Sequence, residues 1–500
     1  MLRWVSGCLI AGSLCAANPA CAEWLEIKTE HFTIYGNMSQ ARAMDYAIKV
    51  EKFDRMLRLL TNVQDSKDVP IDRVIIYVVP SVDAIRSMTR SSRIAGYYGS
   101  SAQGTLAVMP LQVPSEWDVG TNYILFHEYS HHILLSSTEF RYPGWIQEGF
   151  AELFGTATMK NDGSIVIGAP PQMRGWALHR QYQMTVEELL GSDGRRLSDE
   201  ELEDKYARGW LLSHYLVLSG KRSGQFDAYL RLVARGVSPV EAGRTAFGDL
   251  GRLNTELNVY NRQGRFPLVA IPASKTQVRN ITTRVLSACE AKIMPTRVRS
   301  AGGVTEKMAP ALVAPARKVA AECPNDAFVH RALAEIEYDA KNDTAAIAAA
   351  DRAIALQPDN VMAMVYKGRA FARQKKWVDA RRWFIKANRL NPDYALPLML
   401  YYDTFMEAGQ QPPKAATDGL YRAVVLAAQD EALRRRVAYA LIRSGDLKTA
   451  RTVLAPVGFS AHGSSTNGAL AVIKKIDSGA DAQSVAAEAD KAKWKELGKF

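Results

Sequence analysis

Three prolines in the second half of the chain recur at a fixed interval. Pro324, Pro358 and Pro392 are spaced by 34 residues, twice over. A period of this length indicates a repeated pair of helices that buries its apolar face only by stacking on its neighbours. Residues 311–460 are also rich in alanine, and small residues let paired helices touch closely. The spacing therefore predicts that this half of the chain is an all-α array of stacked helix pairs.

One of these units resembles the tetratricopeptide repeat in detail. The unit that ends at Pro392 has small and aromatic residues at the family's positions, namely Gly368, Phe371, Ala380, Phe384 and Ala387. The preceding unit keeps small residues, but Glu337 stands where an aromatic residue is usual. The resemblance implies tetratricopeptide-like repeats over 311–460 that bind a protein partner, and a generic helical bundle is the alternative. We expect the C-terminal tail, 461–500, to be helical as well.

The first half of the mature chain mixes strand and helix patterns. Strands are predicted where apolar residues alternate or form a short β-branched run, at 24–28, 32–35, 74–79 and 105–109. Helical spacing covers 39–62 and 121–135. Residues 23–260 are therefore expected to form an α+β domain. Residues 261–310 are rich in Arg, Pro, Gly and Ser, and we expect them to be a connecting segment.

The predicted helix 121–135 carries an H-E-x-x-H sequence, from His127 to His131. Residues four apart lie on one face of a helix, so both imidazoles can bind one metal ion. Glu128 is placed to take a proton from a water molecule at that metal. The alternative is a surface helix whose two histidines have other partners. His132 points away from this face and is expected not to bind the metal. His179 and His214 are further candidate site residues, although lone histidines more often have a structural role.

A second motif, W-x-x-E-G-x-A-E, runs from Trp145 to Glu152. Together the two motifs resemble the gluzincin zinc metallopeptidases, especially the peptidase-MA-like group of bacterial envelope proteins. The resemblance implies a thermolysin-like domain of mixed sheet and active-site helices, with one zinc ion per chain. It implies that Glu148 is the third zinc ligand, after His127 and His131. Glu152 resembles the acidic residue that orients a liganding histidine, and a solvated or paired carboxylate is the alternative.

A third segment, around Tyr206, resembles the Y-x-K-G sequence of gluzincin aminopeptidases. Arg208 replaces the lysine, and Gly209 keeps the glycine. The resemblance implies that Tyr206 stabilises the oxyanion of the transition state, because a phenol can donate a hydrogen bond where negative charge develops. A core or capping tyrosine at the start of a helix is the other interpretation.

The aminopeptidase signature G-x-M-E-N is absent, and residues 96–99 contain no acidic group that could hold a substrate's free amine. We therefore expect an endopeptidase that cleaves a peptide or protein substrate with Glu128 as general base. A different class remains open, namely a periplasmic repeat scaffold whose zinc site is vestigial or structural. Hydrolysis of a non-peptide amide, such as a cell-wall component, also remains compatible with the motif.

The N-terminus has the features of a secretory signal peptide. A short basic start and an apolar stretch precede Ala20-Cys21-Ala22, so residues 1–22 are predicted to be removed and the protein to be exported, in the periplasm. Two cysteines remain beyond this segment, Cys289 and Cys323, and export makes them a candidate disulfide, with two buried thiols as the alternative.

No stretch of 18 or more apolar residues follows the N-terminal segment, so we expect no membrane-spanning helix in the mature chain. The formal net charge is +11. The basic residues are scattered rather than gathered with aromatic residues, so we expect no nucleic-acid partner.

Overall fold

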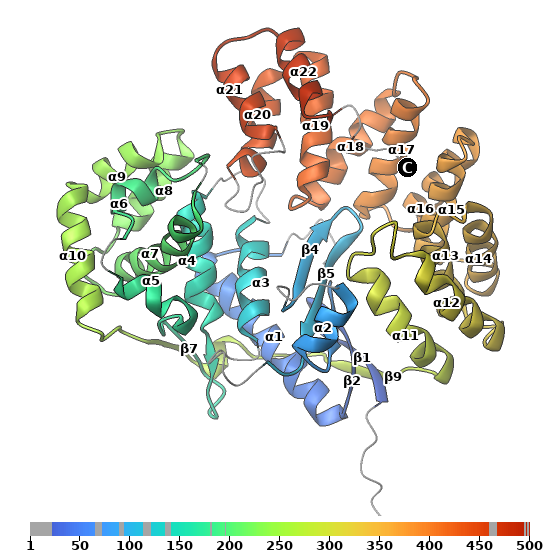
Figure 1. Cartoon of the computed structure of the whole chain (residues 1–500), viewed down its shortest axis with the longest axis horizontal. Coiled ribbons are helices and arrows are strands. Elements are labelled where there is room, and N and C mark those ends of the chain that lie inside the picture. The colour runs from blue at the N-terminus through green and yellow to red at the C-terminus, as the bar shows by residue number, and fades with distance from the viewer. Residues whose placement is uncertain are drawn as a thin grey trace, which may run out of the picture.

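The computed structural model describes residues 23–65, 73–89, 95–113, 122–135, 142–180, 183–195, 197–459, 468–494, 497 and 500. The predicted signal peptide lies outside these residues. The described chain has an α+β part with a six-stranded sheet, followed by helices paired like repeats (Figure 1). Within the described residues, every helix is too short or too polar to span a membrane.

The main sheet has the strand order β4-β5-β3-β2-β1-β9. Its strands are β1 (Glu23–Lys28), β2 (Phe32–Met38), β3 (Val74–Val79), β4 (Tyr97–Ser101), β5 (Gly104–Pro110) and β9 (Thr282–Val285). The central strands β2, β3 and β5 are parallel, while β4 and β9 form the antiparallel edges. The strands predicted from apolar patterns are confirmed. The two edge strands were not predicted, because Gly, Ser, Thr and Arg dominate them.

Successive residues of each strand face opposite sides of this sheet. One face carries Ile34 and Ile76, and helices α1 (Gln40–Thr61) and α3 (Tyr123–Leu135) pack there with them in one core. Phe53 of α1 and Phe126 of α3 stack with ring centroids 3.8 Å apart. The opposite face carries Tyr35 and Tyr77, in a core shared with α2 (Val82–Thr89) and α11 (Ala288–Ala301). The sheet therefore separates the α3 side from the α11 side.

Seven helices complete the α+β part on the α3 side of the sheet (Figure 1). They are α4 (Gly144–Gly155), α5 (Gly175–His179), α6 (Val186–Leu190), α7 (Asp199–Val217), α8 (Gln225–Ala234), α9 (Pro239–Phe247) and α10 (Leu250–Arg262). A small second sheet joins β6 (Thr158–Met159), β7 (Ile165–Ile167) and β8 (Val269–Ile271). Ser198 caps the long helix α7, which begins one residue later, in a capping box with Glu201.

The segment 261–310 differs from the connection that its composition predicted. Strand β8 joins the small sheet, and β9 pairs with β1 at the edge of the main sheet. Helix α11 then packs against α12 (Pro310–Glu322) as the first helix pair. Composition misleads here because β9 needs a neighbour, β1, that lies more than 250 residues away in the chain.

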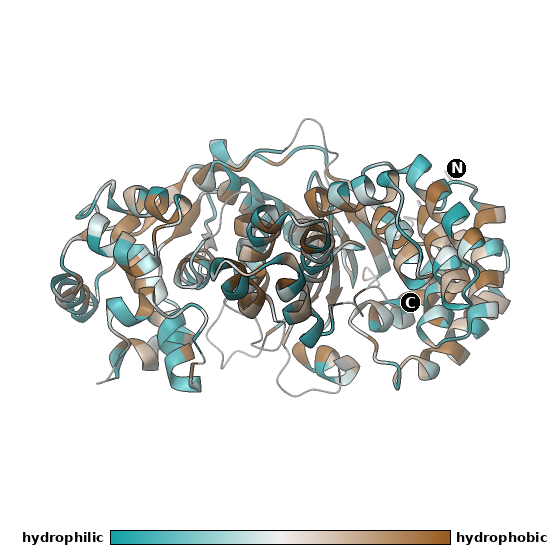
Figure 2. Cartoon of the chain, turned by 90° about the horizontal axis from the view of Figure 1, so that it is seen from above, coloured by the Kyte–Doolittle hydropathy of each residue, from teal (hydrophilic) through white to brown (hydrophobic). Residues whose placement is uncertain are grey.

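Paired helices continue from α11 to the C-terminus. After α12 they are α13 (Ala327–Asp339), α14 (Asp343–Leu356), α15 (Val361–Arg373), α16 (Trp377–Leu390), α17 (Ala395–Glu407), α18 (Lys414–Leu426), α19 (Glu431–Ser444), α20 (Leu447–Gly458), α21 (Ala469–Asp477) and α22 (Ala482–Lys491). Figure 2 shows hydrophobic and hydrophilic residues alternating along these helices, as in amphipathic packing. The expected repeat-like helical region is present, and the tail is helical where it is described.

One position explains a residue of the repeat pattern in physical terms, and another explains a departure from it. A side chain at Gly368 of α15 would come within 2.6 Å of the Phe384 ring of α16, so only glycine fits this contact. Glu337, where the family has an aromatic residue, is buried, and the Arg317 guanidinium donates hydrogen bonds to both of its carboxylate oxygens. An ion pair with α12 thus replaces an apolar contact in this unit.

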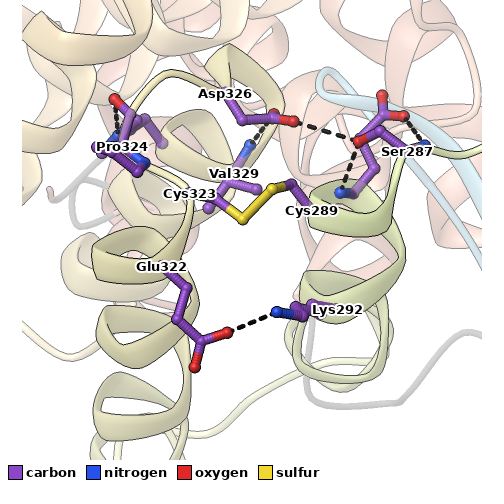
Figure 3. Close-up of a disulfide and its surroundings, with 10 residues drawn as sticks. Ser287, Cys289, Lys292, Glu322, Cys323, Pro324, Asp326 and Val329 are labelled. Carbon is purple, nitrogen blue, oxygen red and sulfur yellow. Dashed lines mark hydrogen bonds and ion pairs between the residues drawn. A yellow bond between two sulfur atoms is a disulfide. The ribbon is translucent and has the colours of Figure 1, made fainter.

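The predicted pairing of Cys289 with Cys323 is present as a disulfide (Figure 3). It joins α11 to the end of α12. Two polar contacts flank it: Lys292 pairs with Glu322 at 2.7 Å, and the Ser287 hydroxyl donates to Asp326 at 3.4 Å (Figure 3). The bond closes the first helix pair at the point where the sheet ends and the repeats begin.

Candidate metal centre

Helix α3 presents His127 and His131 on one face. The helix is apolar around them, and its residues Leu125, Phe126 and Tyr129 are buried in the main core. The Nε2 atoms of the two histidines lie 3.3 Å apart, and both side chains are more than nine-tenths buried. The four-residue spacing in a rigid, buried helix therefore points both ring nitrogens at one place.

Helix α4 brings Glu148 to the same place. Its Oε2 atom lies 3.6 Å from Nε2 of His127 and 3.5 Å from Nε2 of His131. The carboxylate is almost completely buried. The three side chains are thus one group of nitrogen and oxygen donors, all within 4.8 Å of one another.

The spacing of these donor atoms suits a tetrahedral ion. Ligand atoms about 2.0–2.1 Å from a tetrahedral zinc ion lie about 3.3–3.4 Å from each other. The three measured separations, 3.3, 3.5 and 3.6 Å, are close to that edge length. Two imidazoles and one carboxylate are also a donor set that zinc accepts, with a fourth position left for water or substrate. The residues therefore fit the metal that the two motifs imply.

The electrostatics of the group also favour a cation. Burial alone would lower the pKa of His127, but Glu148, Glu152 and Glu128 outweigh it and raise the pKa above its ordinary value. Three carboxylates thus surround two imidazoles in a site with little solvent. Such a concentration of negative charge is stabilised by a bound metal ion.

Two glycines set the distance between α4 and α7. A methyl group at Gly149 would lie 2.4 Å from the carbonyl oxygen of Gly209, and one at Gly209 would lie 2.9 Å from the carbonyl oxygen of Trp145. The helices therefore meet backbone to backbone. Because Gly149 follows Glu148 and Gly209 lies one turn beyond Tyr206, this contact places both functional side chains relative to each other.

Glu152, one turn after Glu148, is completely buried and lies behind His127. Its Oε1 atom is 3.8 Å from Nδ1 of His127, an ion-pair distance that exceeds a hydrogen bond. The nearer partners are Arg174, whose Nε donates to Oε1 at 2.9 Å, and Tyr123, whose hydroxyl donates to Oε2. Glu152 is thus a paired carboxylate that faces the histidine.

Tyr206 of α7 also lies beside His127. Its ring centroid is 6.1 Å from that of His127, and the Arg174 guanidinium covers its ring at 4.3 Å. Burial and the charge of Glu148 raise the pKa of Tyr206 above its ordinary value. The phenol therefore keeps its proton and can act as a hydrogen-bond donor.

Glu128 is half-buried next to the two histidines and is not one of the three clustered donors. Its charge acts on His127, Tyr206 and Tyr98. Tyr98 belongs to the edge strand β4, and burial followed by the charge of Glu128 raises its pKa well above the ordinary value. Glu128 is thus near enough to His127, Tyr206 and Tyr98 for its charge to act on all three.

The remaining histidines have other surroundings. His132 stacks on Tyr129 with ring planes 17° apart, and burial lowers its pKa to about 4. His214 lies between the Pro267 carbonyl oxygen at 3.1 Å and the Tyr260 hydroxyl at 2.9 Å. His179 is exposed at the end of α5. None of the three belongs to the metal-ligand group among the described residues.

Arg174 and Tyr123 are site residues that sequence reasoning missed. Neither belongs to the H-E-x-x-H or E-G-x-A-E motif. Arg174 closes a short 3-10 turn and reaches Glu152, Glu203 and the Tyr206 ring at once. An arginine in a loop-like segment has no periodicity that would mark it, so only the tertiary structure identifies it.

A second group of carboxylates around a histidine lies where the β1–β2 turn meets the second half of α1. His31 Nδ1 is 2.8 Å from Glu51 and 3.0 Å from Asp54, and Nε2 is 3.1 Å from Asp65. Burial lowers the pKa of His31, but Asp54 and Glu51 raise it to about 10. Both ring nitrogens of His31 therefore have carboxylate partners, which makes this group an ion-pair network.

Comparisons with known proteins add little. No known family model matches the chain, and no curated protein matches its sequence. A solved structure named MamA AMB-1 C2221 is 18% identical and covers 32% of this chain and 94% of its own length, with a TM-score of 0.24. Because that score is low, the likeness carries no argument about fold or function.

Proposed function

We propose that this chain is an exported zinc metallopeptidase of the gluzincin type. The observation that carries the proposal is the triangle of Nε2, Nε2 and Oε2 atoms from His127, His131 and Glu148, with edges of 3.3–3.6 Å. Bound there, a zinc ion would supply Lewis acidity for a water molecule and for a substrate carbonyl.

The other side chains have separate roles in this proposal. Glu128 accepts a proton from the attacking water and returns it to the leaving amine, as a general base and then acid. The Tyr206 hydroxyl donates a hydrogen bond to the oxygen on which negative charge develops. Glu152, held by Arg174 and Tyr123, keeps the His127 ring in position through its charge.

We propose an extended peptide substrate and internal cleavage. Among the described residues, strand β4 pairs with β5 on one side only, so its other edge can offer backbone groups. An extended peptide can add to such an edge by backbone hydrogen bonds. The ring of Tyr98 of β4 lies 6.3 Å, centroid to centroid, from that of His132 of α3, so this strand packs against the helix that carries Glu128.

The compartment and the role of the repeats are further parts of the proposal. The Cys289–Cys323 disulfide supports export, because disulfides persist in oxidising compartments such as the periplasm. The repeat-like helices from α11 to α22 form a large surface beside the α+β part, which supports recruitment of a protein partner (Figure 1).

The decisive experiment is Glu128→Gln, measured by cleavage of a quenched fluorescent peptide library and by metal analysis. Glutamine keeps the size of the side chain but does not accept the proton, so turnover should fall by about 10²–10⁴-fold while zinc content stays the same. Glu200→Gln, on the exposed side of α7, is the matched control and should cleave like wild type.

Two further outcomes separate this proposal from a scaffold. His131→Ala should lose the zinc ion, and unchanged metal content in that variant would contradict the ligand assignment. If the protein is a scaffold with a structural zinc site, the wild-type protein should cleave no peptide. The Glu128→Gln variant should then also fully restore the phenotype of cells that lack the protein. Either result would favour the scaffold.

A further inference from the structure

A cavity of about 750 Å³ lies between the sheet and the first repeats, on the face of the sheet opposite the metal centre. Its floor contains Tyr35 and Tyr77, which face away from α3. Its walls come from α11, α13 and α15, and the hairpin between β4 and β5 closes one end. The cavity therefore exists only because the repeats are folded against the α+β part.

Arg297 of α11 lines this cavity and is only 7% exposed. Its guanidinium lies 4.4 Å from the ring centroid of Phe328, 5.3 Å from that of Tyr35 and 5.6 Å from that of Tyr77. Among the described residues, its Nη1 atom is buried and has no hydrogen-bond partner. Burying a cation with an unpaired hydrogen-bond donor costs free energy, and a bound anion that accepts from this donor would offset that cost.

Two further arginines line the same cavity. The guanidinium of Arg331 on α13 lies 5.4 Å from the ring centroid of Phe328, and that of Arg369 on α15 lies 4.3 Å from the ring centroid of Tyr338. The Nε atom of Arg369 is also buried without a hydrogen-bond partner among the described residues. Three guanidinium groups thus converge from three different helices.

The acidic side chains nearby do not balance this charge. Glu335 pairs with Arg331 at 3.3 Å, and Asp339 accepts a hydrogen bond from Ser300 at 3.2 Å. Burial and the neighbouring Glu335 raise the pKa of Asp339 to about 6, so this carboxylate is still mostly ionised at neutral pH. Glu26 also lines the cavity but is paired with Lys28 and Arg284, and the remaining charged residues of the lining, Arg73 and Asp359, are both exposed. Among the other charged residues of the lining, which are not exposed, the three arginines therefore exceed Glu335 and Asp339 by one positive charge.

We propose that this cavity binds a carboxylate group presented by an extended peptide, with Arg297 and Arg369 as its main partners. Guanidinium groups bind carboxylates through paired hydrogen bonds, and both arginines have an unused donor. The carboxylate belongs either to the C-terminus of the peptide or to an Asp or Glu side chain. The site is separate from the metal centre and does not depend on hydrolysis.

The rest of the cavity favours a peptide over a small inorganic anion. Its volume is that of a site for a ligand with many atoms, and a lone phosphate would leave most of it empty. Amide side chains at its rim, Gln103, Asn360 and Asn391, can donate to and accept from a peptide backbone. Met362 and Tyr394 offer apolar surface for the side chains of the same peptide.

The test uses the whole mature chain with Glu128→Gln, so that the probes are not cleaved. Three pools of random pentapeptides are immobilised: one with free C-termini, one amidated but containing Asp and Glu, and one amidated without acidic residues. The protein should be retained by the first pool, the second or both, and not by the third. Retention by the first alone identifies a C-terminal carboxylate, and retention by the second identifies an acidic side chain.

Arg297→Met should reduce this retention by at least about 10-fold, the loss expected when a charged hydrogen-bond partner is removed. Arg299→Met is the matched control, because Arg299 lies on the same helix but is exposed. If Arg297→Met lowers the melting temperature, the retention test is made instead with Arg369→Met, which changes a different wall of the cavity. Equal retention by the third pool, no retention by any pool, or wild-type retention by the arginine variants would overturn the proposal.

Discussion

Arg174 connects side chains that the sequence motifs treat separately. It donates to Glu152 through Nε, pairs with Glu203 through Nη1 and covers the ring of Tyr206. Glu152 in turn faces His127. One guanidinium thus holds the residue behind a candidate metal ligand and the candidate oxyanion donor in fixed relation.

We predict that Arg174→Gln lowers kcat by about 10–100-fold, because residues that orient metal ligands typically have effects of that size. KM should change less, since Arg174 is not expected to touch substrate. Cleavage kinetics of a defined peptide with metal analysis measure both. Arg195→Gln, a half-exposed arginine paired with Glu201, is the control. An unchanged kcat in Arg174→Gln would show that Glu152 and Tyr206 need no such support.

His31 gives the fold a dependence on pH that can be predicted in sign. Its pKa is raised to about 10 in the folded chain, because Asp54 and Glu51 outweigh burial, against about 6.5 when unfolded. A group with a raised pKa stabilises the fold below the unfolded value, and the stabilisation is lost as pH rises toward the folded value.

The difference in unfolding free energy between wild type and His31→Gln should therefore shrink by more than about 1 kcal/mol between about pH 6 and about pH 10. Urea unfolding at several pH values measures it. The same substitution at exposed His179 is the control. If the difference in unfolding free energy between wild type and His31→Gln instead increased toward high pH, His31 would not be held in its charged form.

At the scale of elements, the metal centre depends on how closely α4 and α7 pack. Their contact is made by Gly149 and Gly209, each of which lies in one of the recognised motifs. These glycines are needed for the approach of the two backbones and take no part in chemistry. The motif thus specifies a helix–helix contact as well as a set of ligands.

Gly149→Ala should destabilise the protein by at least about 1–3 kcal/mol, because its methyl group would meet the rigid Gly209 carbonyl at 2.4 Å. Zinc content should fall in the same variant, since Glu148 moves with α4. Gly175→Ala is a matched control in helix α5, where an added methyl group meets nothing within 4 Å. Thermal unfolding and metal analysis of both variants test this, and equal melting temperatures would refute it.

At the scale of the whole molecule, the β4–β5 hairpin joins the sheet to the repeats. The backbone N–H of Ala102 donates to Asp430 at 2.7 Å, and Asp430 also caps α19. The hydroxyl of Tyr394 donates to the Gln103 carbonyl oxygen at 3.2 Å, and the Gln103 amide donates to Tyr366. The hairpin that carries the open edge strand is therefore held by three different repeat helices or their boundaries.

We predict that Asp430→Asn loosens this junction. Asparagine can still cap α19 through its oxygen, but its amide would then face the N–H of Ala102, donor against donor. Hydrogen exchange of residues 97–105 should become at least about 5-fold faster. Asp446→Asn, at the cap of α20, is the control and should leave that hairpin unchanged. Unaltered exchange in Asp430→Asn would mean that the repeats do not hold the hairpin.

The sequence by itself predicted the local elements, and its two motifs, through the family resemblance, indicated the three candidate donor residues. Apolar alternation marked β1, β2, β3 and β5, and helical spacing marked α1 and α3, because both patterns reflect a buried face with a fixed period. His127 and His131 could be paired from spacing alone, since a helix fixes which residues share a face. The repeat-like region and the disulfide partners were also predictable, from a constant interval and from the two cysteines that remain.

Only the tertiary structure decided what comes together across long stretches of chain. Strand β9 pairs with β1 through backbone hydrogen bonds, which carry no side-chain signature. Arg174 was recognisable only by its contacts with Glu152 and Tyr206. The arginine cavity needs three helices and a sheet face at once, and no period or motif relates Arg297 to Arg369. Local patterns record which face of an element is buried, whereas the packing of distant elements decides which side chains meet.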